Sequence, residues 1–160
     1  MFDIVTYPDP VLRQMAEPVT EFDVSLKEFL NEMEVTMYEK DGVGLAANQV
    51  GALRQVIVID PGDGPIRLMN PEIIEKSEET DVLEEGCLSL PDIRVNVTRP
   101  VRVLVKGMNE KGESVTYNAE GFAAKIFQHE IDHLHGRLII DYLSPLKRSL
   151  MKSKLKKLEA

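Results

Sequence analysis

The chain has 160 residues, of which 43% are hydrophobic and 29% charged, and its formal net charge is −8. This length suits one domain with a sizeable core, and the single cysteine excludes an intrachain disulfide. The longest apolar run, residues 56–59, is far too short to span a bilayer. The N-terminus lacks the basic stretch and apolar core of a signal peptide, so we expect a cytoplasmic protein with no membrane contact.

Charge is unevenly distributed along the chain. Residues 146–160 hold six basic residues and one acidic residue, a local charge of +5, which leaves −13 on residues 1–145. An acidic body is not typical of a general nucleic-acid binder, because phosphate contacts need clustered Lys and Arg. We therefore expect a main unit, residues 1–145, and a basic C-terminal helix of the same domain, residues 146–160.

The first predicted helix has a start signal and a stop signal. Ser25 and Glu28 have the spacing of a capping box, with Ser25 as the cap. Asp41-Gly42 predicts the end of the helix, because glycine adopts the left-handed conformation easily. The apolar residues at helical spacing, expected to be buried, are Leu26, Phe29, Leu30, Met33 and Met37.

Strand patterns fill the middle of the chain. Residues 55–60 are β-branched and apolar, which predicts a buried strand. Residues 66–117 are strand-like with breaks. Within them, the turn sequence at 109–112 predicts a hairpin between residues 101–108 and 113–117.

A second helix is predicted from about residue 120 to residue 135, stopped by Gly136, and a basic helix follows Pro145. Strands mostly precede helices without regular βαβ alternation, which favours an α+β fold over a doubly wound sheet. We expect antiparallel strands packed around this central helix, which carries a metal-binding motif.

Residues 128–133 read Gln-His-Glu-Ile-Asp-His and place the H-E-x-x-H spacing on the predicted helix. Four residues advance an α-helix by about 400°, so His129 and His133 project from one face. Two neutral imidazoles there can bind one metal ion, with Glu130 placed to carry a proton. His135 lies about 200° from His133 and is interpreted as a cation near the helix C-terminus. Two solvated histidines are the alternative, since this short pattern also arises by chance.

A hydrolytic metal site usually has three protein ligands and one open position. After His133 the only acidic residues are Asp141, which is too near, and Glu159, which lies in the basic tail. The third ligand is therefore sought upstream, where Cys87 follows Gly86, a residue that permits close backbone approach. A lone cysteine is more often inert core, but the incomplete metal site favours Cys87 as a ligand.

These motifs resemble the signature of the peptide deformylase family, in the family's order. The three matching segments are residues 42–49 (GVGLAANQ), 85–89 (EGCLS) and 128–134 (QHEIDHL). The similarity covers nearly the whole chain; each segment alone is moderately specific, and the three in order are very specific. The Gly-rich segment lacks the third glycine and the Lys-Ser/Thr pair of nucleotide-binding loops.

The resemblance implies a hydrolase of protein biosynthesis that removes the N-formyl group from the formyl-methionine of newly made polypeptides, releasing formate. Residues 1–145 are then the catalytic domain. One divalent metal ion would be held by Cys87, His129 and His133. These ligands suit Zn²⁺ and equally accept Fe²⁺, Ni²⁺ or Co²⁺. The resemblance implies Fe²⁺ in the cell, with Zn²⁺ as a frequent substitute.

Catalytic roles carry over at matching positions. Glu130 is expected to accept a proton from the attacking water and return it to the leaving amine. Gln49 matches the family's hydrogen-bond donor to the formyl oxygen, and the backbone N–H of Leu88 is expected to assist it. Asp132 is expected to orient a helix terminus or a group behind the metal ligands, and it is assigned no chemical role.

Substrate binding is expected to combine main-chain pairing with a side-chain pocket. Backbone groups of Gly44 and Gly86 are suited to pairing with the N-formyl-methionyl peptide as an added strand. The residues expected in the methionine pocket are Val43, Phe122 and Ile126. Lys125 lies one turn before His129, so its stem is expected to reach this pocket and affect fine specificity.

Other interpretations remain open. A general zinc peptidase would need a downstream ligand, and a structural metal module would need a fourth protein ligand, which a chain with one cysteine does not offer. The basic tail fits a solvated amphipathic helix that partly buries Leu146, Leu150, Leu155 and Leu158. It also fits docking on ribosomal RNA, which the resemblance implies for bacterial members. We expect a monomer.

Overall fold

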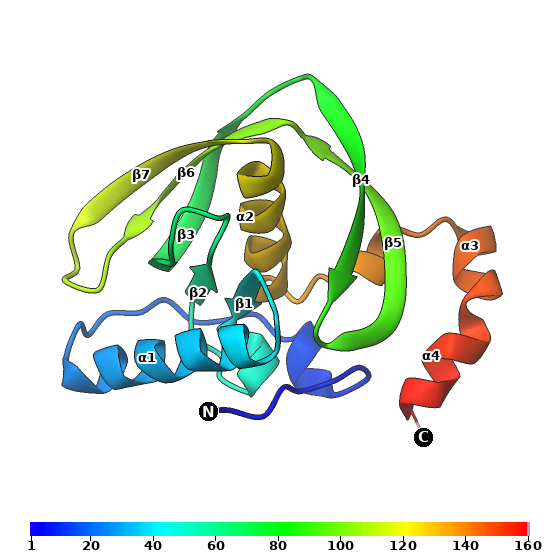
Figure 1. The fold of residues 1–160 in the computed structure, drawn as a ribbon, viewed down its shortest axis with the longest axis horizontal. Helices are drawn as coiled ribbons and strands as arrows, with labels where there is room; N and C mark the ends of the chain where they lie inside the picture. The colour runs from blue at the N-terminus through cyan, green and yellow to red at the C-terminus, as the bar shows by residue number, and fades with distance from the viewer. Residues whose placement is uncertain (160) are drawn as a thin grey trace.

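Seven strands in the computed structural model, which describes residues 1–159, form two antiparallel sheets (Figure 1). The larger sheet has the strand order β1-β2-β3-β6-β7, and the smaller pairs β4 with β5. The strands are β1 Gly44–Ala46, β2 Val56–Ile59, β3 Ile66–Lys76, β4 Thr80–Cys87, β5 Leu90–Pro100, β6 Arg102–Met108 and β7 Ser114–Glu120. The predicted α+β class with antiparallel strands is confirmed.

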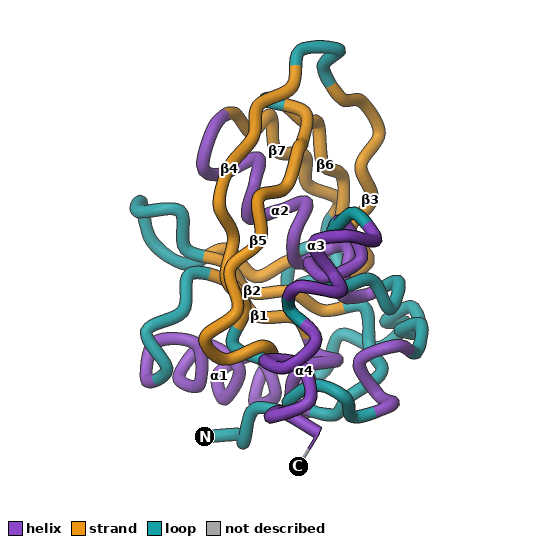
Figure 2. Tube along the Cα trace, turned by 90° about the vertical axis from the view of Figure 1, so that its right-hand side faces the viewer, coloured by secondary structure: helices purple, strands orange, loops and turns teal. Residues whose placement is uncertain are grey.

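A central helix lies between the two sheets. The helices are α1 Val24–Glu39, α2 Gly121–Leu134, α3 Pro145–Leu150 and α4 Lys152–Glu159, with 3-10 turns η1 Pro10–Arg13, η2 Ala47–Val50 and η3 Ile139–Tyr142. In Figure 1, α2 stands between the five-stranded sheet and the β4–β5 ribbon, and Figure 2 views the molecule from the side on which β4 and β5 run next to each other. Its apolar side packs on the larger sheet, where Phe127 and Ile131 join Ile57 and Leu68 in one cluster. Because the helix is enclosed from both sides, four of its polar residues are buried as well, namely Gln128, His129, Glu130 and His133.

The first helix begins two residues earlier than predicted. Asp23, not Ser25, is its cap, and the Asp23 carboxylate accepts a hydrogen bond from the Leu26 N–H at 2.9 Å. A carboxylate caps a helix as well as a hydroxyl does, and its negative charge is also stabilised by the positive end of the helix dipole. The helix ends at Glu39, and Asp41, not the predicted glycine, takes the left-handed φ of 56°. The predicted apolar residues that are fully buried are Leu26, Leu30, Met33 and Met37, whereas Phe29 is partly buried.

The predicted strands are present, and the fold divides them between the sheets. The pattern at residues 55–60 forms β2, and the predicted hairpin forms β6 and β7, with Met108 opposite Ser114. The strand-like stretch 66–117 separates in space, because β3 pairs with β6 while β4 and β5 leave the sheet between them. This excursion places the end of β4 across from α2.

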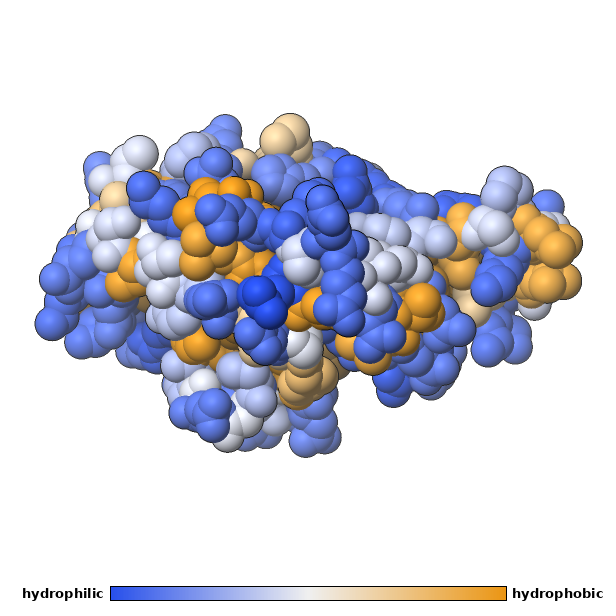
Figure 3. All heavy atoms as spheres, turned by 90° about the horizontal axis from the view of Figure 1, so that it is seen from above, coloured by the Kyte–Doolittle hydropathy of each residue, from blue (hydrophilic) through white to orange (hydrophobic). Residues whose placement is uncertain are grey.

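The C-terminal segment contains two helices rather than one, interrupted at Met151. Leu155 is buried and Leu158 partly buried in a cluster with β5 residues, as predicted. Leu146 and Leu150 are 70% and 75% exposed, so the prediction of their partial burial is wrong. The break turns α3 away from the body, and Figure 3 shows apolar atoms gathered at this end of the molecule. Within residues 1–159, none of the helices has the length and apolar character needed to cross a membrane.

Gly136 ends α2 as predicted, with a φ of 75°, and a Cβ there would lie 2.4 Å from the Arg13 carbonyl oxygen. We expect Gly136→Ala to lower the free energy of unfolding by more than about 2 kcal/mol. The left-handed conformation alone costs a side chain roughly 1–2 kcal/mol, and the backbone clash adds to it. Denaturant unfolding measures the loss.

Gly121→Ala is the matched control for this substitution. Gly121 also has a left-handed φ, 58°, but its Cβ would have nothing within 4 Å. Gly121→Ala therefore reports the conformational cost alone. Equal losses of stability in the two variants would contradict the clash at Gly136.

Candidate metal centre and active site

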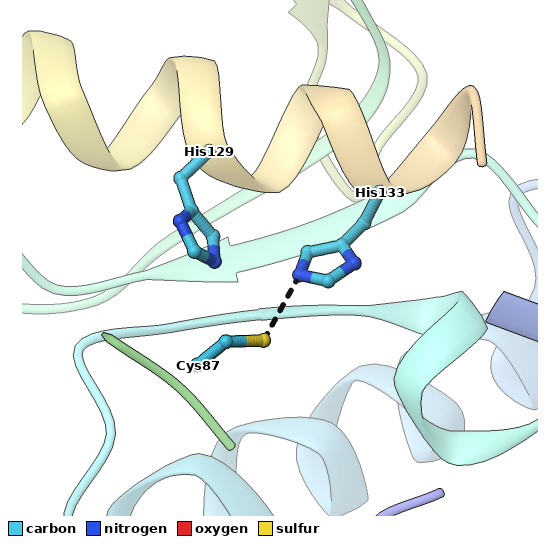
Figure 4. Close-up of side chains that lie close together, drawn as sticks. All are labelled: Cys87, His129 and His133. Carbon is cyan, nitrogen blue, oxygen red and sulfur yellow. Dashed lines mark hydrogen bonds between the residues drawn. The ribbon is translucent and has the colours of Figure 1, made fainter. Parts of the chain in front are cut away.

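The predicted metal ligands meet where two imidazoles of α2 project toward the end of β4 (Figure 4). Cys87 is the last residue of β4, and its Sγ lies 3.4 Å from Nε2 of His133. The ligand atoms of Cys87, His129 and His133 all lie within 4.8 Å of one another. Helical spacing aligns the two histidines, whereas only the fold brings in the cysteine, which is 46 residues before His133.

This donor set fits one divalent transition-metal ion, since catalytic sites commonly use three protein ligands of these kinds. His129 Nδ1 pairs with a Glu85 carboxylate oxygen at 2.8 Å, which directs Nε2 toward a metal. Burial holds the pKa of His133 well below its usual range, so this imidazole is neutral, as a ligand must be. Burial also acts to lower the pKa of His129, but the Glu130 charge and hydrogen bonds to Cys87 and Glu85 raise it well above the usual value.

Glu130 lies beside the metal ligands with its carboxylate buried. Its side chain is 4% exposed, and Oε1 has no hydrogen-bond partner within the described part of the chain. Burial raises the pKa of Glu130 to about 7. A carboxyl with that pKa can both accept and return a proton near neutral pH.

Gln49 is held with its amide nitrogen toward the metal ligands. Its Oε1 accepts a hydrogen bond from the Ala46 N–H at 3.0 Å, which fixes the orientation of the amide. Its Nε2 donates to the Ser89 hydroxyl at 3.2 Å and lies 3.5 Å from the Cys87 sulfur. Leu88 follows Cys87 directly, in the turn between β4 and β5. Both predicted donors to the substrate oxygen therefore lie next to the metal ligands.

A cavity of about 540 Å³ opens over these groups. The predicted binding residues Val43, Gly44, Gly86, Phe122 and Ile126 all line it, together with Gln49, Leu88 and Glu130. Val43 and Phe122 remain 45% and 47% exposed, so the cavity offers apolar surface to a substrate side chain. Lys125 also lines the cavity, and its Nζ donates to the Glu84 carbonyl at 3.2 Å.

Two charged residues behind the ligands, Glu85 and Arg99, have no role predicted from the sequence. Glu85 and Arg99 are 1% and 6% exposed and form an ion pair at 2.6 Å. Burial raises the pKa of Glu85, but hydrogen bonds from His129 and Arg99 outweigh it and hold that pKa below its usual range. The sequence offers a signal for Glu85, because this residue lies in the segment 85–89 that matches the family signature. It offers none for Arg99, which lies in a strand with an ordinary alternating pattern. Asp132 accepts a hydrogen bond from Arg99 at 3.0 Å.

Gly44 leaves the space that the Glu130 carboxylate occupies. A Cβ at Gly44 would lie 2.4 Å from Oε2 and 2.9 Å from Cδ of Glu130. We expect Gly44→Ala to lower kcat/KM by about 100-fold, because a misplacement of about 1 Å has that effect on a reacting group. Stability should change little, since a side chain can move where a backbone cannot. Formate release, metal content and the unfolding midpoint test this, and full activity would contradict it.

Known proteins provide an independent comparison. The chain matches the profile of the polypeptide deformylase family over residues 1–149. It is 53% identical over 155 residues to the peptide deformylase of Thermotoga maritima, covering 97% of this chain and 94% of the relative. It is 45% identical over 166 residues to peptide deformylase 1 of Rickettsia conorii, covering 98% and 95%.

Solved structures agree with these sequence matches. The crystal structure of the Thermotoga maritima peptide deformylase has a TM-score of 0.89 at 53% identity, covering 91% of this chain and 99% of that one. The Legionella pneumophila peptide deformylase has a TM-score of 0.93 at 41% identity, covering 99% and 95%. Sequence, fold and the grouping of side chains under the cavity all agree, and this chain belongs to the polypeptide deformylase family.

Proposed function

We propose that this enzyme removes the N-formyl group from the formyl-methionine of newly made polypeptides through the residues gathered under the cavity, releasing formate. The observation that carries the proposal is the convergence of Cys87, His129 and His133, whose ligand atoms lie within 4.8 Å of one another, beside the buried Glu130. A divalent ion held by these three residues would supply Lewis-acid chemistry, polarising a carbonyl and lowering the pKa of water.

Glu130 is the proposed proton carrier. Its carboxylate accepts a proton from the water that attacks the formyl carbon. As the C–N bond breaks, Glu130 returns that proton to the α-amine of methionine, and formate leaves. The pKa of about 7 supports both halves of this cycle.

Gln49 and the backbone N–H of Leu88 are the proposed donors to the oxygen on which negative charge develops. Because the Ala46 N–H holds Oε1 of Gln49, the amide need not reorient when that charge appears. Such preorganised donors stabilise the transition state more than the substrate, which is the condition for faster turnover.

The cavity supports recognition of the substrate by main chain and side chain together. Gly44 lies in β1 and Gly86 in β4, and we propose that their backbone groups pair with an extended peptide between these strands. The proposed walls of the methionine pocket are Val43, Phe122 and Ile126, with the stem of Lys125 beside them. Main-chain pairing leaves the later residues of the peptide free to vary.

Fe²⁺ is the ion we propose for the cell, on the family resemblance, with Zn²⁺, Ni²⁺ and Co²⁺ as alternatives that the ligands accept. The test combines metal analysis of protein purified without oxygen with formate release from a formyl-methionyl peptide. We expect formate release that depends on bound metal. Internal cleavage of an unformylated peptide would instead indicate a general peptidase, and activity in metal-free protein would contradict the proposal.

We further propose that the enzyme works as a cytoplasmic monomer and that its basic C-terminal segment docks on ribosomal RNA. The local charge of +5 and the exposed Leu146 and Leu150 support a docking role. Phosphate contacts release counterions, so ribosome binding should weaken steeply as salt increases. We expect Lys156→Glu/Lys157→Glu to weaken binding and Lys27→Glu on α1 to leave it unchanged. Binding that does not respond to salt would contradict this docking mode.

A further inference from the structure

A series of hydrogen-bonded polar groups, buried at its inner end and partly exposed at its outer end, runs outward from the first histidine ligand. The Oε1 atom of Glu85 accepts from His129 Nδ1 at 2.8 Å and from Arg99 Nη2 at 3.0 Å. The other carboxylate oxygen of Glu85 accepts from Arg99 Nε at 2.6 Å. Arg99 therefore holds Glu85 through both oxygens, which leaves the carboxylate a single orientation toward the imidazole.

The same guanidinium reaches two further elements. Arg99 Nη1 donates to Oδ2 of Asp132 at 3.0 Å, and the Tyr142 hydroxyl donates to that oxygen at 2.6 Å. The guanidinium carbon also lies 4.9 Å from the centre of the Tyr142 ring. Asp132 lies on α2 between the two histidine ligands, whereas Tyr142 comes from η3.

These contacts close a ring. It runs from His129 through Glu85 on β4 and Arg99 on β5 to Asp132, and the backbone of α2 returns it to His129. A closed ring fixes both the rotation of the imidazole and the distance of the helix from β5. A single hydrogen bond to His129 would fix only the rotation of the imidazole.

Net stability does not explain such a chain. Taking charges out of water costs about as much as their attraction returns, and apolar residues of similar volume often stabilise a core equally well. Orientation of metal-binding histidines by hydrogen-bonded carboxylates is, by contrast, worth about 10–100-fold in metal affinity or activity. This series of hydrogen-bonded groups ends on His129, a predicted ligand. Its position therefore points to a role in orienting that imidazole.

We propose that Arg99, Asp132 and Tyr142 are positioning residues that hold the metal site in its geometry through Glu85 and His129. This inference rests on the proposed metal site and extends it from three ligands to the elements β5 and η3. Tyr142 occupies the outermost place: its hydroxyl holds Asp132, and its ring covers the guanidinium.

The test uses Co²⁺-loaded protein with three readouts: the visible absorption of the bound ion, its rate of loss to a chelator, and the unfolding midpoint of the metal-free form. We expect Arg99→Met to lose Co²⁺ about 100-fold faster and Tyr142→Phe about 10-fold faster, the two ends of the range for such partners. Both absorption spectra should shift. Arg99→Lys should recover part of the effect, since an ammonium carries the charge but cannot bridge Glu85 and Asp132 in the same way.

Matched controls separate positioning from general stability. Arg67 also joins three partners, namely Asn31, Glu34 and Glu110, away from the metal ligands. The Tyr38 hydroxyl donates to the Asp60 carboxylate in the same way as Tyr142 donates to Asp132. Arg67→Met and Tyr38→Phe are therefore expected to change only the unfolding midpoint, with the Co²⁺ spectrum and release rate unchanged.

Two failures are distinguishable. If the unsubstituted protein does not bind Co²⁺ through its thiolate, the proposed metal site is itself wrong. If it binds Co²⁺ normally while Tyr142→Phe and Arg99→Met retain the parent spectrum and release rate, only the positioning role is overturned. Tyr142→Phe keeps the ring and removes one hydroxyl, so its result stands even if Arg99→Met fails to fold.

Discussion

Glu130→Gln is expected to keep its metal and to lose turnover by about 10²–10⁴-fold, the usual contribution of a positioned acid–base group. The amide has nearly the same shape as the carboxylate, so it fits the same buried space, where the side chain is 4% exposed. An amide cannot accept the proton of the attacking water. The loss should therefore appear in kcat, with little change in the binding of a formyl-methionyl peptide.

Formate release and metal content, measured on the same preparation, check this result. Glu28→Gln is the matched control, because Glu28 is exposed on α1, far along the chain from the metal ligands. It should behave like the parent protein. If Glu130→Gln retains most of its activity with a full complement of metal, another group carries the proton.

Cys87→Ser is expected to have the largest effect on metal retention. Serine keeps the size of the side chain but remains a protonated hydroxyl, whereas the thiolate is an anionic and softer donor. Loss of a group that hydrogen-bonds to a metal ligand already lowers metal affinity by about 10–100-fold. Loss of the ligand itself should therefore lower metal affinity by more than about 100-fold. We expect little bound metal after dialysis and correspondingly little formate release.

His135→Gln is the control for this substitution. His135 is exposed and stands outside the group formed by Cys87, His129 and His133. Its replacement should leave metal content and activity at the parent level. A fully loaded and active Cys87→Ser protein, or loss of metal from His135→Gln, would overturn the assignment of the ligands.

The regular elements of this protein could be predicted because their signals are local. The apolar residues of α1, the turn between β6 and β7, and the stop at Gly136 depend on neighbours a few residues apart. The errors also have local causes. Asp23 and Ser25 are both good caps, and nothing within one turn decides between them. The break at Met151 and the exposure of Leu146 depend on how the C-terminal segment packs against residues 1–145. A helical sequence pattern does not predict that packing.

The candidate site shows the same division. The spacing of His129 and His133 is a property of one helix, so the sequence by itself determined that their imidazoles share a face. The absence of a ligand after His133 made Cys87 the candidate for the third ligand. The sequence does not say how far Cys87 lies from the two histidines.

Only the tertiary structure decided that the end of β4 approaches α2, because that contact depends on where the β4–β5 ribbon leaves the larger sheet. The tertiary structure alone placed Arg99 and Tyr142 behind the ligands. Nothing in the local sequence of β5 or η3 indicates that these two residues lie near a metal site. Periodicity acts over one or two turns, whereas a metal site joins residues tens of positions apart. Local chemistry therefore determined the helix that carries the histidines, and packing decided what surrounds them.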